Sequence, residues 1–499
     1  MAAIHKNATT REVNEALEKS WNAYREFRKR DLKDRVAFLK AIAKEIKEAG
    51  NELIAVADKE TNLGLARLTT ELKRTVFQLN SYADACVEGS WLDIRIDTAD
   101  ANRNPAKPDL RKMLVPLGPV VVFGASNFPF AYSTAGGDTA CALAAGCSVI
   151  IKAHPAHAET SEFVADAVYM ASRKCNLPED IFIHLHGASF EVGKELVQHP
   201  LTKAVGFTGS YEGGKALFDL ANKRKEPIPV FAEMGSVNPV FILPEQLKKD
   251  TAGIATMCAN SITLSAGQFC TNPGILVGIE DESLDAFEKL LGDQIKKVKP
   301  ARMLHTGIAK SFIQKREKVL AGESVAIAAT TAFKAGQDES IPTLAKVSAK
   351  VFLKNPLLHK EVFGPFSLLV KCNDANELIQ VARAMEGQLT CSLMATEDEM
   401  KSNLELVEIL KDKCGRFVVN GVPTGVEVAL SMHHGGPYPA TTDSRFTSVG
   451  ADGIKRFARP VCFQNWTNEL LPAELKNENP HGLWRTVNNE LTKNQVPAI

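Results

Sequence analysis

The sequence has no excess of charge of either sign. Its 499 residues include 59 Lys and Arg and 59 Asp and Glu, so the formal net charge is zero. Proteins that bind polyanions such as nucleic acid draw much of their affinity from clustered basic residues. The balance gives no indication of a nucleic-acid partner, and we expect none.

Long apolar runs are absent as well. No segment approaches the roughly 18 uninterrupted apolar residues that a membrane-spanning helix needs. Residues 1–7 lack the apolar stretch of a signal peptide. The ten cysteines include no CxxC pair and do not resemble a disulfide framework in so long a chain. We therefore expect a cytoplasmic protein that does not contact the membrane.

The histidines show no metal-binding motif. Their spacings match none of the standard patterns, so solvated or packed histidines are the better interpretation and we expect no bound metal. The histidines considered are 154, 157, 184, 186, 433 and 434.

Length and composition predict a folded protein of two or three domains. Apolar residues make up 45% and charged residues 24% of the chain, as in globular proteins. Residues 11–64 show helical periodicity, with at most a local break at Gly50. Residues 92–117 are polar and contain prolines, which predicts an extended arm or hairpin, and the polar tail from 465 is expected to wrap or pair.

From residue 118 onward, strands and helices are predicted to alternate. This alternation implies right-handed βαβ units built around a parallel sheet, so the fold class is α/β. The first block has predicted strands at 120–123, 148–152, 181–185, 204–208 and 230–233, and helices at 134–146, 158–174, 190–198 and 211–222. The second block, about 249–432, has strands at 351–353, 366–370 and 416–420, and helices at 375–385 and 401–411.

Cys270 is the first candidate for chemistry. It lies between a helix-like run, 252–264, and a strand-like run, 275–279, where a side chain can face a cleft between domains. A nucleophilic cysteine needs partial exposure and a lowered pKa. Taken alone, a buried structural cysteine is the commoner explanation.

Two further candidates follow predicted strands. Glu233 closes the strand at 230–233, where α/β active sites form, and could act as a general base; an ion-paired strand end is the alternative. Asn127, in Ser-Asn-Phe-Pro, could donate its amide N–H to an oxyanion; a turn before proline is the alternative.

A glycine-rich turn joins a strand to a helix at Gly206-Phe-Thr-Gly-Ser210, followed by Gly213-Gly214. Glycines let the backbone approach a pyrophosphate, and a helix N-terminus favours negative charge. The spacing is not GxGxxG, so by itself the turn indicates a nucleotide only weakly. Glu361, in Glu-Val-Phe-Gly-Pro, says little by itself.

Together and in this order, the five motifs resemble the aldehyde dehydrogenase superfamily over residues 10–470. The resemblance implies a Rossmann-like cofactor domain, an α/β catalytic domain and a small oligomerisation arm, in a homodimer or homotetramer. It places the cofactor domain at 1–91 and 118–235, the catalytic domain at 236–432, and the arm and tail at 92–117 and 465–499.

The resemblance also implies roles for single residues. Cys270 would be the nucleophile, Asn127 with the Cys270 backbone N–H would bind the oxyanion, and Glu233 would activate water for deacylation. The implied cofactor-binding residues are Lys152, His154, Phe207, Gly209, Ser210, Glu361 and Phe363.

Departures from the common family pattern narrow the substrate. Ser126 replaces a frequent tryptophan, and His433–Pro439 replaces a segment containing Phe-Gly-Gly. With Glu233–Pro239, these features resemble α-ketoglutarate semialdehyde (2,5-dioxovalerate) dehydrogenases and NADP-preferring fatty aldehyde dehydrogenases. We expect oxidation of α-ketoglutarate semialdehyde; a medium- or long-chain aliphatic aldehyde is the alternative. Transfer to coenzyme A and a catalytically silent scaffold are disfavoured by the intact Glu233 and Cys270.

The cofactor is expected to be NADP or NAD. Many NAD-preferring members carry a glutamate at the position of Pro155, and its absence removes repulsion against a 2′-phosphate. This favours NADP without excluding NAD, with positive charge from Lys152 and potentially from His154 or Lys194. For the far carboxylate of the substrate, the sequence offers only guesses, Arg74 and Arg445, for which structural salt bridges are the alternative.

Overall fold

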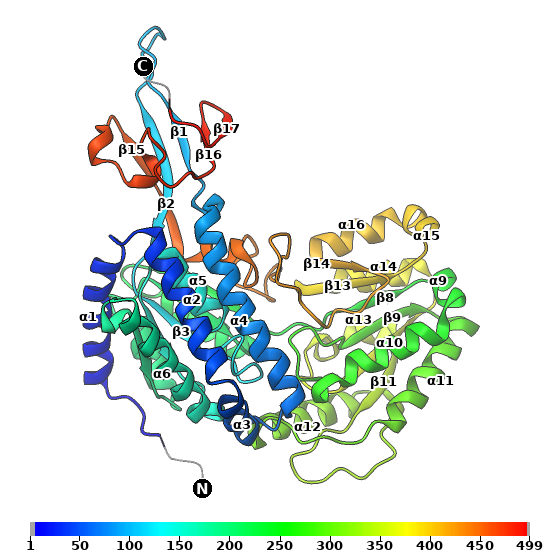
Figure 1. Ribbon diagram of the computed structural model, residues 1–499. Helices are drawn as coiled ribbons and strands as arrows, with labels where there is room; N and C mark the ends of the chain where they lie inside the picture. The colour runs from blue at the N-terminus through cyan, green and yellow to red at the C-terminus, as the bar shows by residue number, and fades with distance from the viewer. Residues whose placement is uncertain (1–4, 497–499) are drawn as a thin grey trace.

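The computed structural model describes residues 5–496 and contains three sheets. Two of them are flanked by helices and form two bodies side by side, and the third forms an arm that projects above the first body (Figure 1). The predicted α/β class is confirmed.

The first sheet is wholly parallel, with the order β5-β4-β3-β6-β7. Its strands are short, apolar and buried, as expected of a sheet covered on both faces. The strand order changes direction between β3 and β6, and loops at such a point form a crevice at the carboxyl edge. The strands are β3 (Val120–Phe123), β4 (Val149–Lys152), β5 (Phe182–Leu185), β6 (Ala204–Thr208) and β7 (Val230–Glu233).

Helices cover both faces of this sheet. Apolar side chains of α1, α7 and α8 pack on one face, and those of α2, α4, α5 and α6 pack on the other. These helices are α1 (Thr10–Phe27), α2 (Leu32–Glu48), α3 (Gly50–Thr61), α4 (Leu65–Glu88), α5 (Gly137–Ala145), α6 (Ala158–Lys174), α7 (Phe190–Gln198) and α8 (Tyr211–Asn222).

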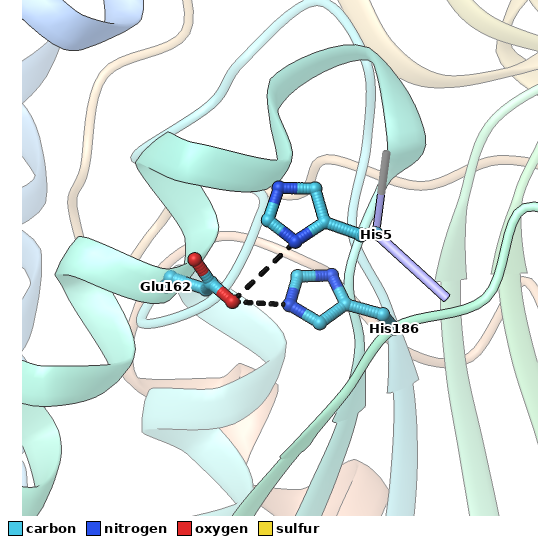
Figure 2. A group of neighbouring side chains, drawn as sticks. All are labelled: His5, Glu162 and His186. Atoms are coloured by element: carbon cyan, nitrogen blue, oxygen red, sulfur yellow. Dashed lines mark hydrogen bonds and ion pairs between the residues drawn. The ribbon is translucent and has the colours of Figure 1, made fainter. Parts of the chain in front are cut away.

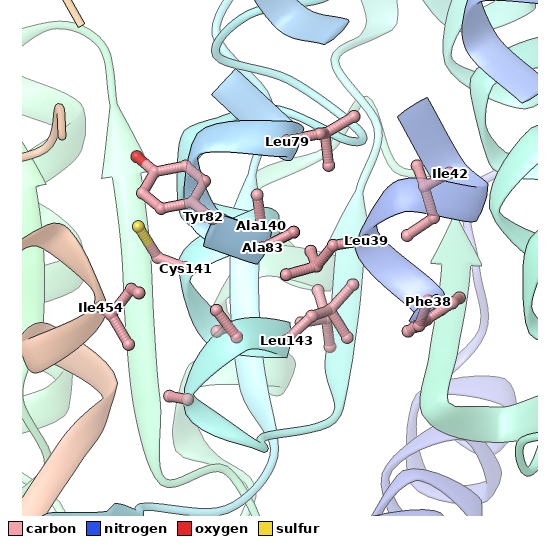
Figure 3. Packing of buried hydrophobic residues seen from close by; sticks show 14 of the residues in the cluster. Phe38, Leu39, Ile42, Leu79, Tyr82, Ala83, Ala140, Cys141, Leu143 and Ile454 are labelled. Atoms are coloured by element: carbon pink, nitrogen blue, oxygen red, sulfur yellow. The ribbon is translucent and has the colours of Figure 1, made fainter. Parts of the chain in front are cut away.

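The core of this body lies where α2, α4 and α5 meet (Figure 3). Leu39 of α2, Leu79 of α4 and Leu143 of α5 are almost completely buried there. Ala83 and Ala140 let the helices approach closely, which explains the run of small residues in the sequence. The small-residue helix is shorter than the predicted 134–146, since α5 begins at Gly137.

The second sheet has the order β10-β11-β12-β9-β8-β13-β14 and is parallel except for β10. Its strands are β8 (Val240–Ile242), β9 (Ile275–Ile279), β10 (Ala326–Thr330), β11 (Thr343–Ser348), β12 (Phe366–Cys372), β13 (Gln388–Met394) and β14 (Cys414–Val419). Its helices are α9 (Pro244–Lys249), α10 (Thr251–Thr263), α11 (Glu282–Lys297), α12 (Thr306–Leu320), α13 (Ala349–Lys354), α14 (Ala375–Ala384), α15 (Glu397–Ser402) and α16 (Leu404–Lys413).

The strand predicted at 351–353 is wrong, because these residues lie in α13. Ser348 caps this helix, its hydroxyl accepting a hydrogen bond from the Val351 N–H at 3.4 Å, and Phe352 is buried in the core of the second body. Three apolar residues in a row suit a strand or a helix equally, so the serine cap and the tertiary packing determine that this segment is helical. The helix predicted at 401–411 is likewise interrupted, at Asn403.

The third sheet joins residues from distant parts of the chain. It has the order β15-β2-β1-β16-β17, and β1 pairs with β16 of the tail in parallel. The strands are β1 (Arg95–Asp97), β2 (Leu110–Pro116), β15 (Ala458–Gln464), β16 (Arg485–Val487) and β17 (Glu490–Thr492), of which β15 had been left unassigned. The buried Arg485 holds the tail together by donating to the carbonyls of Lys476, Asn477 and Asn494. Over residues 5–496, no helix combines the length and apolar character needed to cross a membrane.

Candidate active site

A cleft of about 480 Å³ opens between the first and second bodies. Its floor is formed by the carboxyl ends of β3, β4, β6 and β7, and its opposite wall by segments of the second body. All ten residues predicted from the sequence line this cleft: Asn127, Lys152, His154, Phe207, Gly209, Ser210, Glu233, Cys270, Glu361 and Phe363.

A tight turn places Cys270 at the cleft. Ser265, Ala266 and Gly267 all have left-handed backbone conformations after α10 ends. Gly267 packs so closely on the carbonyl of Gly364 that a Cβ atom would overlap it. The Asn238 amide then donates to the Cys270 carbonyl at 2.8 Å, so the backbone of the cysteine is held on both sides.

Cys270, His434 and Glu233 form a contiguous cluster. The Cys270 Sγ lies 3.7 Å from His434 Nε2, which lies 3.1 Å from Glu233 Oε1. The second carboxylate oxygen of Glu233 accepts a hydrogen bond from the Ser448 hydroxyl at 2.8 Å. Both His434 and Glu233 are buried, so the cluster has little room to rearrange.

The cluster shifts the pKa values of its members in opposite directions. Burial, reinforced by the negative charges of Glu233 and Glu361, raises the pKa of Cys270 well above its usual value. Burial also favours the neutral form of Glu233, but the contacts with His434, Ser448 and Cys270 outweigh it and lower the pKa of Glu233. The thiol therefore holds its proton near neutral pH, contrary to the lowered pKa expected of a nucleophile, with a proton acceptor adjacent.

Asn127 is fixed beside the cysteine turn. Its side-chain amide donates a hydrogen bond to the Gln268 backbone carbonyl at 3.1 Å, and its backbone carbonyl accepts one from the Arg67 guanidinium at 2.6 Å. The Arg67 guanidinium lies over the rings of Phe128 and Phe269, at 4.9 and 4.7 Å from their centroids. An amide group has two N–H bonds, so Asn127 retains one for a second acceptor.

The other end of the cleft suits a dinucleotide. Ser210 caps α8, its hydroxyl accepting from the Gly213 N–H at 3.1 Å, and the helix N-terminus there favours an anion. Gly209 lies so near Phe207 that a Cβ atom would be 2.6 Å from the ring. Burial lowers the pKa of Lys152 to about 8 and raises the pKa of Glu361 to about 7.

Two cations considered from the sequence do not contribute positive charge to the cleft. Burial and the neighbouring His157 and Lys152 lower the pKa of His154 well below its usual value, so its imidazole is neutral. Lys194 lies 3.5 Å from Glu191 on α7 and does not line the cleft. Lys315 of α12, which the sequence did not single out, does line it.

His434 is a candidate functional residue that sequence reasoning missed. It was grouped with histidines interpreted as solvated or packed, although its segment, His433–Pro439, was noted as a departure from the family pattern. The structure brings it between Cys270 and Glu233, which are far away in the sequence. The departure of His433–Pro439 from the common family pattern is the feature of the sequence that could have pointed to His434.

A second cluster of histidines and a carboxylate lies outside the residues that line the cleft (Figure 2). Glu162 accepts from His186 at 2.7 Å and lies 3.5 Å from His5, and the two rings stack at 4.2 Å. The Ala8 N–H also donates to the His186 carbonyl. These contacts hold the segment before α1 against the end of β5.

Comparisons with known proteins agree with this geometry. The model of the "Aldehyde dehydrogenase family" matches residues 1–457. Alpha-ketoglutaric semialdehyde dehydrogenase 2 of Azospirillum brasilense is 46% identical, covering 96% of this chain and 91% of that protein. The alpha-ketoglutaric semialdehyde dehydrogenase of Acinetobacter baylyi is 43% identical, covering 98% and 93%.

Solved structures share the fold at lower identity. Glyceraldehyde-3-phosphate dehydrogenase GapN from Methanocaldococcus jannaschii, complexed with NADP, has a TM-score of 0.77 at 20% identity, covering 92% of this chain and 95% of that one. Succinic semialdehyde dehydrogenase from Streptococcus pyogenes, in complex with NADP+, has a TM-score of 0.77 at 17% identity, covering 92% and 96%.

The family predicted from five ordered motifs is thus confirmed by a match along most of the chain and by relatives of nearly full length. The chain belongs to the aldehyde dehydrogenase family, whose members oxidise aldehydes to acids.

Proposed function

We propose that this enzyme oxidises α-ketoglutarate semialdehyde to α-ketoglutarate, with reduction of NAD(P), through a thioester on Cys270. The observation that carries the substrate is the 46% and 43% identity, over nearly the whole chain, to two α-ketoglutaric semialdehyde dehydrogenases. The cluster of Cys270, His434 and Glu233 provides the groups that the chemistry needs.

The first step is activation of the thiol. Because the pKa of Cys270 is raised, the thiol needs a base. In the His434 tautomer that carries its proton on Nδ1, Nε2 is unprotonated and lies 3.7 Å from the sulfur, so it can accept the thiol proton. The resulting imidazolium donates a hydrogen bond to Glu233, which stabilises the charge. The thiolate then attacks the aldehyde carbon and forms a thiohemiacetal.

The oxyanion that forms in this attack needs hydrogen-bond donors. We assign this task to the free N–H of Asn127 and the backbone N–H of Cys270, and one such donor contributes about 3–4 kcal/mol. NAD(P), when bound, supplies the hydride acceptor that the oxidation to a thioester requires.

Hydrolysis of the thioester is assigned to Glu233. Its lowered pKa keeps it a carboxylate at neutral pH, so it can accept a proton from the attacking water. The C–S bond then breaks, the carboxylate product leaves, and the Cys270 sulfur is returned for another cycle. An intact Glu233 favours water over coenzyme A as the acceptor.

The cofactor site is assigned to the end of the cleft near α8. The cradle at Gly209, the capped helix N-terminus and a buried lysine fit a dinucleotide phosphate. The residues proposed to hold it are Lys152, His154, Phe207, Gly209, Ser210, Glu361 and Phe363. We favour NADP over NAD, because Pro155 brings no carboxylate against a 2′-phosphate while Lys152 supplies positive charge.

We further propose that the enzyme is a cytoplasmic homodimer or homotetramer that associates through the arm. Leu470 and Leu491, on the arm and tail, are 70% and 68% exposed, as expected of apolar side chains that another subunit covers. All ten cysteines lie within residues 5–496 and are free thiols, in keeping with a reducing compartment.

Steady-state kinetics test the proposal. We expect kcat/KM for α-ketoglutarate semialdehyde to exceed that for a C6–C10 aliphatic aldehyde by about a hundredfold, on the order of 2.7 kcal/mol, with NAD and NADP each tested. A preference for the aliphatic aldehyde would reject the substrate and favour a fatty aldehyde dehydrogenase. Cys270→Ser should abolish activity with both aldehydes, whereas Cys462→Ser, at an exposed cysteine of the arm, should not.

A further inference from the structure

One face of α4 packs against the segment that carries Asn127, close to Cys270. Arg67, Glu71 and Arg74 are spaced by four and three residues, so their side chains share that face. Arg67 donates to the Asn127 carbonyl, and Glu71 accepts from the backbone N–H groups of residues 130–131. Arg74 comes next along the same face, at Tyr132.

Tyr132 connects Arg74 to the reactive cysteine. The Tyr132 ring lies 6.4 Å from the ring of His434, which in turn contacts Cys270. Burial raises the pKa of Tyr132, whereas the nearby charge of Arg74 opposes this rise and Glu233 and Cys270 add to it. Arg74, Tyr132 and the Cys270 cluster therefore lie close to one another.

Arg416 of β14 approaches this group of side chains from the second body. It donates to the carbonyls of Gly425 and Pro423, and Arg74 donates to the carbonyl of Val426. One loop thus anchors both guanidinium groups, although they come from different bodies. The charge of Arg416 also acts on Cys270 and Tyr132, so Arg416 lies near the same side chains.

Both guanidinium groups retain buried donors without partners. Within residues 5–496, Arg74 Nε and Nη2 and Arg416 Nε are buried and make no hydrogen bond. Neither arginine forms a salt bridge there, although Glu71 lies next to Arg74 on the helix. Buried, unpaired guanidinium donors are costly, so they indicate an acceptor that arrives with a ligand.

We propose that Arg74 and Arg416 bind the α-keto carboxylate end of the substrate and so determine specificity. This inference rests on the proposed function, in which the substrate carries its aldehyde at one end and its carboxylate at the other. With the aldehyde at Cys270, the carboxylate lies against the two arginines, whose planar groups match a carboxylate in geometry and charge.

Arg445, the other arginine considered from the sequence, does not fit this task. Its side chain is 79% exposed and paired with Asp443 at 2.5 Å, so its donors are already occupied. Arg445 is therefore a suitable control, because it is the same type of residue as Arg74 and Arg416 but its charge is already paired.

The test compares charged and uncharged aldehydes of the same chain length. Arg74→Met and Arg416→Met should each lower kcat/KM for α-ketoglutarate semialdehyde by about 100-fold and leave that for pentanal unchanged. Arg74→Lys, which keeps the charge, should recover part of the loss. Arg445→Met should behave as the wild type with both aldehydes. Undiminished pentanal oxidation shows that each variant is folded.

Binding of the product gives a second readout that does not depend on turnover. Calorimetric titration with α-ketoglutarate should show affinity weakened at least about tenfold in Arg74→Met and Arg416→Met. If the wild type prefers the semialdehyde but the variants lose both aldehydes equally, or lose neither, the arginine assignment is wrong and the proposed function stands. If the wild type prefers pentanal, the proposed function itself is wrong, and this inference with it.

Discussion

In the proposed mechanism, two neighbouring side chains control the reactivity of Cys270. Burial and the charge of Glu233 keep the thiol protonated, while His434 lies within reach of the same sulfur. A nucleophile of this kind is inert until its base accepts the proton, and this protects the thiol from indiscriminate oxidation. At the scale of residues, the pH dependence of Cys270 reactivity should therefore depend on its proposed base, His434.

Replacing His434 should expose this dependence. In His434→Gln, alkylation of Cys270 by iodoacetamide at pH 7 should slow by about 100-fold, because the thiol loses its base. Without His434, the Cys270 thiol, whose pKa is raised, loses its proton only to hydroxide. The difference in alkylation rate between wild type and His434→Gln should therefore become smaller as the pH rises. The rate is followed by mass spectrometry of the Cys270 peptide. His433→Gln is the control, and parallel pH profiles in wild type and His434→Gln would contradict the assignment.

Lys152 should make NADP binding sensitive to alkaline pH. Burial lowers its pKa to about 8, so the ammonium is charged below that pH and loses its charge above it. NADP affinity, measured by fluorescence titration, should fall above pH 8 by up to about tenfold per unit, while NAD affinity changes less. Lys152→Met should remove the difference, and Lys194→Met should preserve it. A constant ratio of the two affinities between pH 7 and 10 would refute this role.

At the scale of elements, the turn between α10 and β9 does the positioning. A helix brings the chain to the cleft, and consecutive left-handed residues turn it so sharply that Cys270 faces Glu233 of the other body. Only glycine adopts this conformation without strain, and here it also has no room for a Cβ atom. The turn is thus specified by Gly267 rather than by hydrophobic pattern.

Gly267→Ala should therefore destabilise the protein and impair the site. We expect unfolding in urea to require at least about 1 kcal/mol less free energy, because the alanine is strained and its Cβ meets the Gly364 carbonyl. Gly50→Ala, in α3 with open space around it, should be neutral or stabilising. Equal midpoints for wild type and Gly267→Ala would show that the turn relaxes without cost.

At the scale of the whole molecule, two bodies share one cleft and a separate sheet forms the arm. The arm is built from two distant parts of the chain. Strands β1 and β2 follow the first helices, and β15, β16 and β17 are the last strands of the chain. Its exposed apolar side chains lie away from the cleft residues. Association and catalysis should therefore be separable by mutation.

The double variant Leu470→Asp, Leu491→Asp should reduce the oligomer. A charge on each apolar contact makes burial against another subunit unfavourable by a few kcal/mol, so light scattering after gel filtration should give a smaller mass. Leu404→Asp, at a similarly exposed leucine on α16, should leave the mass unchanged. An unaltered mass in the double variant would show that the arm is not the interface.

Much of the fold follows from local pattern. The strands at 120–123, 204–208 and 230–233 agree with the structure because buried parallel strands are mostly apolar runs with a glycine within two residues of their ends. The short run at 351–353 was misassigned since its capping serine and its packing on α14 are not visible in three apolar residues. The secondary structure of so short a segment is determined by the residues that cap it and pack against it.

The sequence by itself predicted the family and ten of the residues that line the cleft, because each motif is a short segment whose backbone and side chains act locally. Tertiary structure alone placed His434 between Cys270 and Glu233, and anchored Arg74 and Arg416 on one loop. These contacts join segments separated by long stretches of chain, and their distances depend on how the two bodies and their connecting loops pack. Periodicity and spacing carry no information about that packing.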